Sequence, residues 1–450
     1  MDLTQGLVYK HLTRLALPSA VALFFATMFF MVDTYFAGMI STEAQAALTV
    51  SFPVFFIIVS MMNGMAIGAQ TLIANFLGEG RHERAKELSV QSLYFGAVFS
   101  LIMAAFGFFF APSLLQFLGA KGAVAEYAER YIRITFLYCV FPVTTHVVNG
   151  ILMSYGLAKP FRNWLIIGFF LHLTLDPWLI FGGMGLPAFG FDGIVYSTAL
   201  TMFLGSCFMF YCLNERGIIS KIAVGRLKPE WIAFQEIARQ SLPATLNLLS
   251  VAIGLFITTG FVFQFGKNAA AAFGIGMRLQ QLFLIATVGL SSAALAIISQ
   301  NHGAKKFARV EECIRFSLYS GGVIMLASFL VLNAAPRQLM SIFSHDRDVI
   351  ETGVSFLRIY SFTGFFLMGL NILTAAMQGM KNPITALMIG FGRQVVVPLI
   401  ALPILIGWFE APLESVWYMT LAVSVLFTAL AFVQTKRILT EKSKPFNEKP

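Results

Sequence analysis

The chain has 450 residues, of which 58% are hydrophobic and only 12% are charged. Soluble domains carry about twice that share of charged residues, so this chain cannot cover its apolar surface in water and is predicted to be an integral membrane protein. The net charge of +9 would suggest a nucleic-acid partner for a soluble protein. Here the basic residues lie in short loops between apolar runs, which is typical of a protein whose partner is the lipid bilayer, and we expect no nucleic acid.

Apolar runs follow one another along the chain, and a run of about 20 residues is long enough to cross a bilayer as a helix. The first run follows Lys10 and Arg14 and is too long for the apolar part of a cleavable signal peptide, so we expect no such peptide. Twelve spanning helices are predicted, near residues 14–38, 46–76, 88–115, 125–155, 161–182, 193–213, 238–265, 270–299, 309–334, 351–378, 384–408 and 413–435.

A polar segment over residues 214–240 separates six predicted helices from six. We therefore expect an N-terminal lobe over 1–213, a cytoplasmic linker over 214–240, a C-terminal lobe over 241–435 and a charged tail over 436–450. If the N-terminus is cytoplasmic, the cytoplasmic loops and tails contain 22 of the 31 Lys and Arg residues. The excess of positive charge then predicts that both termini are cytoplasmic in a bacterial-type inner membrane.

The two lobes repeat each other with an offset of about 225 residues. Six helices separate equivalent points, so both lobes enter the membrane in the same direction and form a parallel repeat. A pseudo-twofold axis along the membrane normal follows, which is typical of alternating-access transporters. The recurring pairs include Pro18 with Pro243, Gly78 with Gly303, Arg133 with Arg358, and Pro160 with Pro383.

Motifs of several enzyme classes are absent from the sequence. There is no GxxxxGK[ST] loop for ATP, no HExxH and no GxSxG, so we expect neither an enzyme nor a bound cofactor. The expected energy source is an ion gradient. The four cysteines lack paired spacing, and we interpret them as apolar packing rather than a disulfide or a metal site. Those cysteines are Cys139, Cys207, Cys212 and Cys313.

Five short segments resemble the multidrug and toxic compound extrusion (MATE) transporters, in particular their DinF-type branch. They are Leu17-Pro18, MVDTYFAG (31–38), LDPWLIFG (175–182), GMRLQQ (276–281) and SQNHGAKK (299–306). The resemblance covers nearly the whole chain. It implies a MATE/MOP-like fold and secondary active efflux of amphipathic organic cations or drugs in exchange for H⁺ or Na⁺.

Two carboxylates lie well inside predicted spanning helices, where charge is costly and marks function. Asp33 is roughly 28 Å above Arg14, and Asp176 is roughly 21 Å above Arg162, so both lie at similar depth in the N-terminal lobe. Burial disfavours a charged carboxylate, which suits these residues to bind a proton, an organic cation or Na⁺ in turn. The resemblance also implies that aspartates in these two helices couple ion flow to export. The alternative is a structural role in which each aspartate bonds to neighbouring backbone.

His172 replaces the asparagine that the family usually has four residues before the second aspartate. His172 and Asp176 share one helix face. A neutral imidazole offers no oxygen to Na⁺ and a protonated one repels cations, whereas imidazole titrates near neutrality. The sequence therefore favours H⁺ over Na⁺ coupling, with Na⁺ at Asp33 and Asp176 as the alternative, and leaves open a structural His172 that never changes charge.

Weaker candidates surround these residues. The family alignment adds Thr198 to the coupling group, and we add Asn149, whose helix face also carries His146 as a candidate for the substrate cavity. For Asn149 and His146 the alternative is hydrogen bonding between helices. Pro18 removes one helical hydrogen bond and is our candidate hinge, with a static kink as the alternative.

The C-terminal half lacks the acidic counterpart, because Thr258 stands where the repeat places Asp33. Arg393 lies near mid-membrane, where it could bind an anionic group or make a structural bond at a helix break, and its role stays open. Two other functions remain. One is a lipid or lipid-linked oligosaccharide flippase of the same superfold; the other is a channel or scaffold. The repeat lies within one chain, so a monomer suffices.

Overall fold

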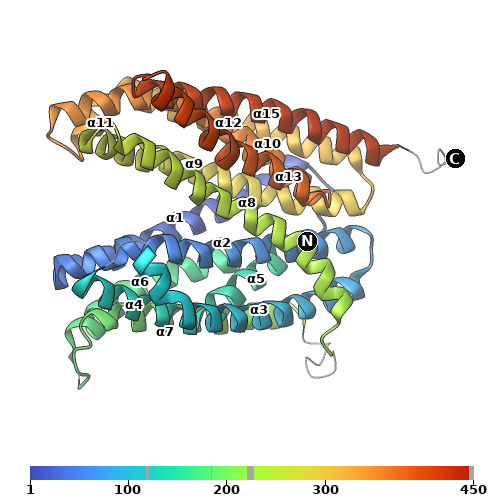
Figure 1. Cartoon of the computed structure of the whole chain (residues 1–450). Coiled ribbons are helices and arrows are strands. Elements are labelled where there is room, and N and C mark those ends of the chain that lie inside the picture. The colour runs from blue at the N-terminus through green and yellow to red at the C-terminus, as the bar shows by residue number, and fades with distance from the viewer. Residues whose placement is uncertain (118–120, 184, 220–227, 445–450) are drawn as a thin grey trace. The chain divides into compact units, whose positions relative to one another are not determined.

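The computed structural model describes residues 1–117, 121–183, 185–219 and 228–444, and these residues are almost entirely helical (Figure 1). Eleven helices are long and apolar enough to cross a membrane, and one bent pair brings the count to twelve among the described residues. The prediction of an all-α, twelve-helix membrane protein is therefore confirmed.

The predicted helices are present, and most extend several residues past the predicted ends. In the first half they are α1 (Val8–Ile40), α2 (Thr42–Gly78), α3 (His82–Phe117), α4 (Gly122–Tyr138), α5 (Val140–Ser154), α6 (Lys159–Phe181) and α7 (Phe191–Glu215). In the second half they are α8 (Trp231–Phe263), α9 (Lys267–Gly303), α10 (Phe307–Ala334), α11 (Pro336–Ser341), α12 (Arg347–Gly379), α13 (Pro383–Phe391), η2 (Gly392–Val396), α14 (Val397–Leu402), η3 (Pro403–Trp408) and α15 (Glu414–Ser443).

Two predicted spans are less regular than expected. The fourth is broken into α4 and α5, which meet at an angle of 48° around Cys139. The eleventh contains two π-helical segments, η2 and η3, next to Pro398 and Pro403. A proline cannot donate a backbone hydrogen bond, and its ring displaces the preceding carbonyl, so local widening of the helix follows.

The chain divides into two compact units. The first unit comprises Met1 and Val21–Thr245, and the second comprises Asp2–Ala20 and Leu246–Pro450. The expected lobes differ from this division because α1 and α8 each begin in one unit and end in the other. Pro18 and Pro243 each lie two residues before the crossing point. Helix α15 also continues to Ser443, so residues 436–443 of the expected tail are helical, while residues 220–227 of the expected linker and 445–450 of the tail lie outside the described residues.

The N-terminal segment is held firmly within the second unit. Leu3 is fully buried, and its backbone N–H donates to Gln300 Oε1 at 2.9 Å. Arg309 donates to the carbonyl oxygens of Gly6 at 2.8 Å, Gln5 at 3.3 Å and Leu3 at 3.4 Å. One guanidinium thus satisfies three backbone carbonyls within residues 3–6, just before α1 begins at Val8.

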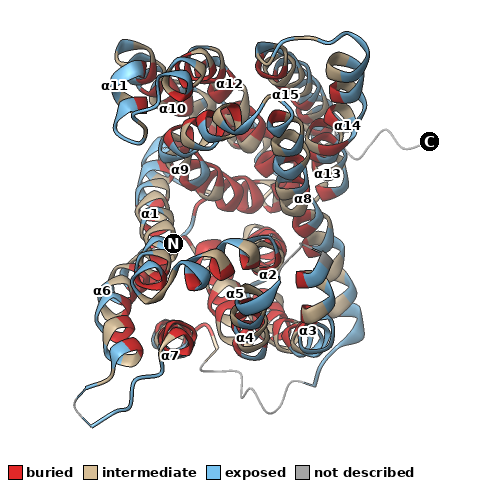
Figure 2. Cartoon of the chain, turned by 60° about the vertical axis from the view of Figure 1, so that its left-hand side comes forward, coloured by how far each residue is buried: buried red, intermediate tan, exposed pale blue. Residues whose placement is uncertain are grey.

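In the second unit, the most buried spans are α9 and α12, which pack against each other (Figure 2). Small residues face large ones at their contact. A Cβ on Gly276 of α9, for example, would lie 2.2 Å from the Phe356 ring of α12. In the first unit a Cβ on Gly150 of α5 would lie 2.4 Å from the Ala66 carbonyl oxygen of α2. Close backbone approach at glycine is the usual packing mode of membrane helices.

Candidate functional site

A buried cluster of two carboxylates and one imidazole joins α1 to α6 in the first unit. His172 Nε2 lies 2.8 Å from Asp33 Oδ1 and 3.5 Å from Asp176 Oδ2. His172 and Asp176 are 0% exposed and Asp33 is 5% exposed. The imidazole therefore bridges the two carboxylates that the sequence singled out.

Ser197 of α7 completes the cluster, although it is not among the site residues predicted from the sequence. Its hydroxyl hydrogen-bonds to Asp176 Oδ1 and lies 3.1 Å from His172 Nδ1. Because the serine hydroxyl donates to the carboxylate, its oxygen is left to accept the Nδ1–H of the histidine. That tautomer directs Nε2 at both carboxylates, and the 2.8 Å hydrogen bond to Asp33 Oδ1 requires one proton between these two atoms.

The local sequence explains why α6 and α7 approach closely enough for this contact. A Cβ on Gly193 would lie 2.7 Å from the backbone of Leu179 and Ile180, so only glycine fits where α7 crosses α6. Ser197 lies one turn further along α7, on the same face as Gly193. A packing contact at Gly193 therefore positions the serine, and no polar sequence motif marks that contact.

Aromatic side chains surround the cluster. The Phe29 ring packs 5.2 Å from the His172 ring, and the phenol groups of Tyr131 and Tyr138 lie within electrostatic range of Asp33. All three are buried. Asp176 Oδ2 and the Tyr138 hydroxyl are sealed from solvent without a hydrogen-bond partner in the described part of the chain. A low dielectric with unmet hydrogen-bonding capacity favours uptake of a proton or a cation.

The other candidates from the sequence lie apart from these contacts. The Thr198 hydroxyl donates to the Ile194 carbonyl of its own helix at 2.9 Å, so the neighbouring Ser197 takes the position expected for Thr198. His146 Nδ1 lies 2.8 Å from the Pro142 carbonyl oxygen. Asn149 is half-buried on α5 and makes no hydrogen bond to the cluster among the described residues.

The cluster has the donor set of a cation site as well as of a proton site. One ligand atom from each of Asp33, His172 and Asp176 lies within 4.8 Å of the other two. Two carboxylate oxygens suit a hard cation such as Na⁺, and the imidazole nitrogen suits it less well. The residues present therefore offer groups for a proton and for a hard cation alike.

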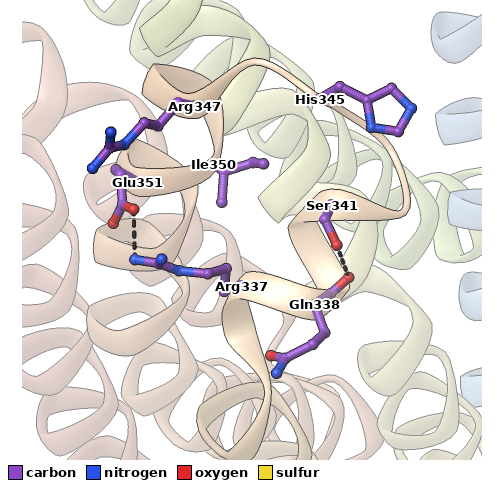
Figure 3. A pocket seen from close by; sticks show the side chains of 7 residues that line it. All are labelled: Arg337, Gln338, Ser341, His345, Arg347, Ile350 and Glu351. Atoms are coloured by element: carbon purple, nitrogen blue, oxygen red, sulfur yellow. Dashed lines mark hydrogen bonds and ion pairs between the residues drawn. The ribbon is translucent and has the colours of Figure 1, made fainter.

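A surface pocket of the second unit, formed by α11 and the start of α12, offers a different environment (Figure 3). Arg337 there pairs with Glu351 at 2.5 Å, and both side chains are exposed. Exposed pairs of this kind are screened by water and contribute little. The buried cluster of the first unit is therefore the stronger candidate site.

Twelve candidate spanning helices in two compact units, with charged side chains buried inside one of them, are typical of a membrane transporter. The sequence model of the MatE family matches residues 18–178 and again residues 243–403. The chain therefore belongs to the MatE family of multidrug and toxic compound extrusion transporters, and the predicted duplication is confirmed.

Relatives with assigned activities span most of the chain. The Multidrug export protein MepA of Staphylococcus aureus is 23% identical over 403 residues, covering 87% of this chain and 86% of MepA. The FAD transporter of Shewanella oneidensis is 27% identical over 399 residues, covering 87% of each chain.

Solved structures of this fold superpose on the whole chain. A MOP superfamily transporter from Pyrococcus furiosus, described as having a binding pocket of reverse polarity, has a TM-score of 0.91 at 23% identity over 99% of this chain and 98% of its own. A MATE transporter in the bent conformation has a TM-score of 0.91 at 24% identity, covering 98% of both chains.

Proposed function

We propose that this protein exports amphipathic organic cations from the cytoplasm in exchange for protons, with Asp33, His172 and Asp176 as the coupling group. The bridging contact of 2.8 Å between His172 Nε2 and Asp33 Oδ1 carries this assignment. A proton and an organic cation compete for the same buried negative charge. Proton binding then releases the cation, and deprotonation restores the site.

Three further features support the proposal. The family consists of transporters, and MepA exports drugs. The cluster is buried, so water screens a change of its charge only weakly. A free imidazole titrates near neutrality. His172 joins two helices, so its charge state can alter how α1 packs against α6.

Proton coupling is preferred to sodium coupling on chemical grounds. His172 occupies the position from which an amide oxygen could otherwise reach Na⁺, and a ring nitrogen is a poorer ligand for that ion. The two carboxylates with the Ser197 hydroxyl still form an oxygen-rich group, so sodium is the second candidate for the coupling ion.

The test uses purified protein in liposomes loaded with ethidium under a pH gradient or a Na⁺ gradient, imposed separately. Wild type is expected to transport under the pH gradient alone. Asp33→Asn is expected to be inactive, since an amide can neither bind a proton at this pH nor carry the negative charge. Thr34→Val, next to Asp33 but bonded only to the Phe30 carbonyl, is the control and should retain transport.

Each outcome separates the alternatives. Transport under the Na⁺ gradient alone would overturn proton coupling and leave His172 with a structural role. Gain of Na⁺-driven transport in His172→Asn would support the proposal, because the amide restores an oxygen ligand. Ethidium that moves under neither gradient would favour the flippase alternative, to be tested with fluorescent lipid.

A further inference from the structure

We propose that the second unit contains a binding site for an anionic oxygen group, a phosphate or a carboxylate, built on Arg393. This site would allow substrates that carry a negative group and not only organic cations. The inference concerns the second unit alone and is independent of the coupling ion.

Arg393 lies within the membrane span Pro383–Trp408, about 15 Å from its start, and only 6% of the residue is exposed. An unpaired guanidinium at that depth is energetically costly unless it finds a counter-charge. No aspartate or glutamate of the described residues forms an ion pair with Arg393. The charge is therefore retained without an internal acid, which points to an acid supplied from outside.

The hydrogen bonds of Arg393 use the Nε and Nη2 donors of its guanidinium and leave Nη1 free of any partner that the structure describes. Nε and Nη2 both donate to Ser424 Oγ, at 3.3 and 3.1 Å, and this hydroxyl in turn donates to the Thr420 carbonyl. Ser424 therefore fixes one edge of the guanidinium and offers no negative charge. Nη1 makes no hydrogen bond with any described residue, and it is not among the polar atoms sealed from solvent. The free edge presents two N–H donors in the fork geometry that phosphate and carboxylate groups match.

The backbone that carries Arg393 departs from a regular α-helix. The residue lies in the π-helical segment η2, where the helix is widened, and such segments are frequent at functional sites. The buried Tyr360 of α12 lies within electrostatic range of the guanidinium, and its hydroxyl is a further donor. Ser424 of α15 and Tyr360 of α12 thus place polar groups near the Arg393 guanidinium of η2.

The chemistry of the site selects its ligand class. A guanidinium with a free edge prefers an oxyanion with two coplanar oxygens over a halide. Such a group can belong to a soluble solute or to the headgroup of an anionic lipid. A pair of fluorescent probes that differ by one phosphate tests for the anionic group, and a lipid competitor distinguishes the two sources.

Riboflavin 5′-phosphate and riboflavin share one fluorophore, and binding of each to the purified protein in neutral detergent is followed by fluorescence anisotropy. Wild type is expected to bind the phosphate form more tightly. Arg393→Gln should weaken binding of the phosphate form about tenfold or more and leave riboflavin within about twofold. Arg393→Lys keeps the charge but not the fork, and is expected to lie in between.

Two controls separate a ligand site from a structural arginine. Arg358→Gln removes an exposed positive charge from α12 in the same unit and should leave both probes unaffected. A purely structural role for Arg393 would weaken both probes equally in Arg393→Gln, and that result would overturn the proposal. Equal affinity of wild type for the two probes would also overturn it, whatever the variants do.

Competition on wild type needs no variant and so does not depend on how well Arg393→Gln folds. Inorganic phosphate should displace the phosphate probe but not riboflavin. Displacement by phosphatidylglycerol as well would assign the site to a lipid headgroup, and displacement by inorganic phosphate alone would assign it to a soluble anion. Ethidium export that persists when these experiments fail would leave the proposed function intact and reject only the anion site.

Discussion

His172 Nε2 lies 2.8 Å from Asp33 Oδ1, and this contact joins helices whose residues are 139 positions apart in the chain. The histidine also lies 3.5 Å from Asp176 Oδ2, on its own helix face. Two acids that would otherwise repel each other thus share one base. Any proton that enters this group changes the attraction between α1 and α6, and in the proposed function this change couples protonation to movement.

The Ser197 hydroxyl should matter more than that of its neighbour Thr198. Ser197→Ala removes the hydrogen bond to Asp176 and the partner of His172 Nδ1, so a buried carboxylate oxygen is left unsatisfied. We expect pH-driven ethidium export to fall about tenfold. Thr198→Ala should change it less than about twofold, since that hydroxyl bonds to its own helix. The reverse order, measured in liposomes, would restore Thr198 as the coupling hydroxyl.

The Gly193 contact between α7 and α6 should be required for both stability and export. Gly193→Ala places a Cβ 2.7 Å from the backbone of α6, which must then shift away. We expect a loss of about 1–3 kcal/mol, seen as a lower Tm, together with weaker export as Ser197 moves from Asp176. Gly260→Ala is the matched control, because nothing lies within 4 Å of its Cβ. Equal Tm values for the two variants would contradict this account of the helix contact.

Pro18 is expected to act as a hinge. It lies two residues before α1 passes from the second unit into the first, and Pro243 holds the same place in α8. Pro18→Ala should slow ethidium export about tenfold while leaving ethidium affinity within about twofold, because a continuous helix resists bending. Pro53→Ala in α2 tests whether removal of any helix proline has this effect. Unchanged turnover in Pro18→Ala would favour a static kink.

The N-terminal segment should contribute to stability through Arg309. Arg309→Ala removes hydrogen bonds to three backbone carbonyls of residues 3–6 and leaves Asn301 Oδ1 without its guanidinium donor. We expect a loss of about 2 kcal/mol or more, visible as a lower Tm in detergent. Arg315→Ala, an exposed arginine of the same helix, should leave Tm unchanged. A similar Tm for both variants would show that the hydrogen bonds of Arg309 contribute nothing to holding the segment.

The sequence by itself determined the class of protein, the number of spanning helices, the duplication and the residues Asp33, His172 and Asp176 as a group. These features can be predicted from the sequence because a membrane-spanning helix requires a long apolar run, and because charge within such a run is rare and costly. The spacing of His172 and Asp176 on one helix face is likewise a local property.

Only the tertiary structure decided which groups touch. Ser197 and Thr198 are neighbours in the sequence, and the rotation of α7 about its axis, set by the contact at Gly193, determines which hydroxyl reaches Asp176. Three further features were not predicted from the sequence: the bend at Cys139, the π-helical segment that carries Arg393, and the passage of α1 and α8 between units. Such features depend on packing between segments far apart in the chain, and local hydropathy carries no record of that packing.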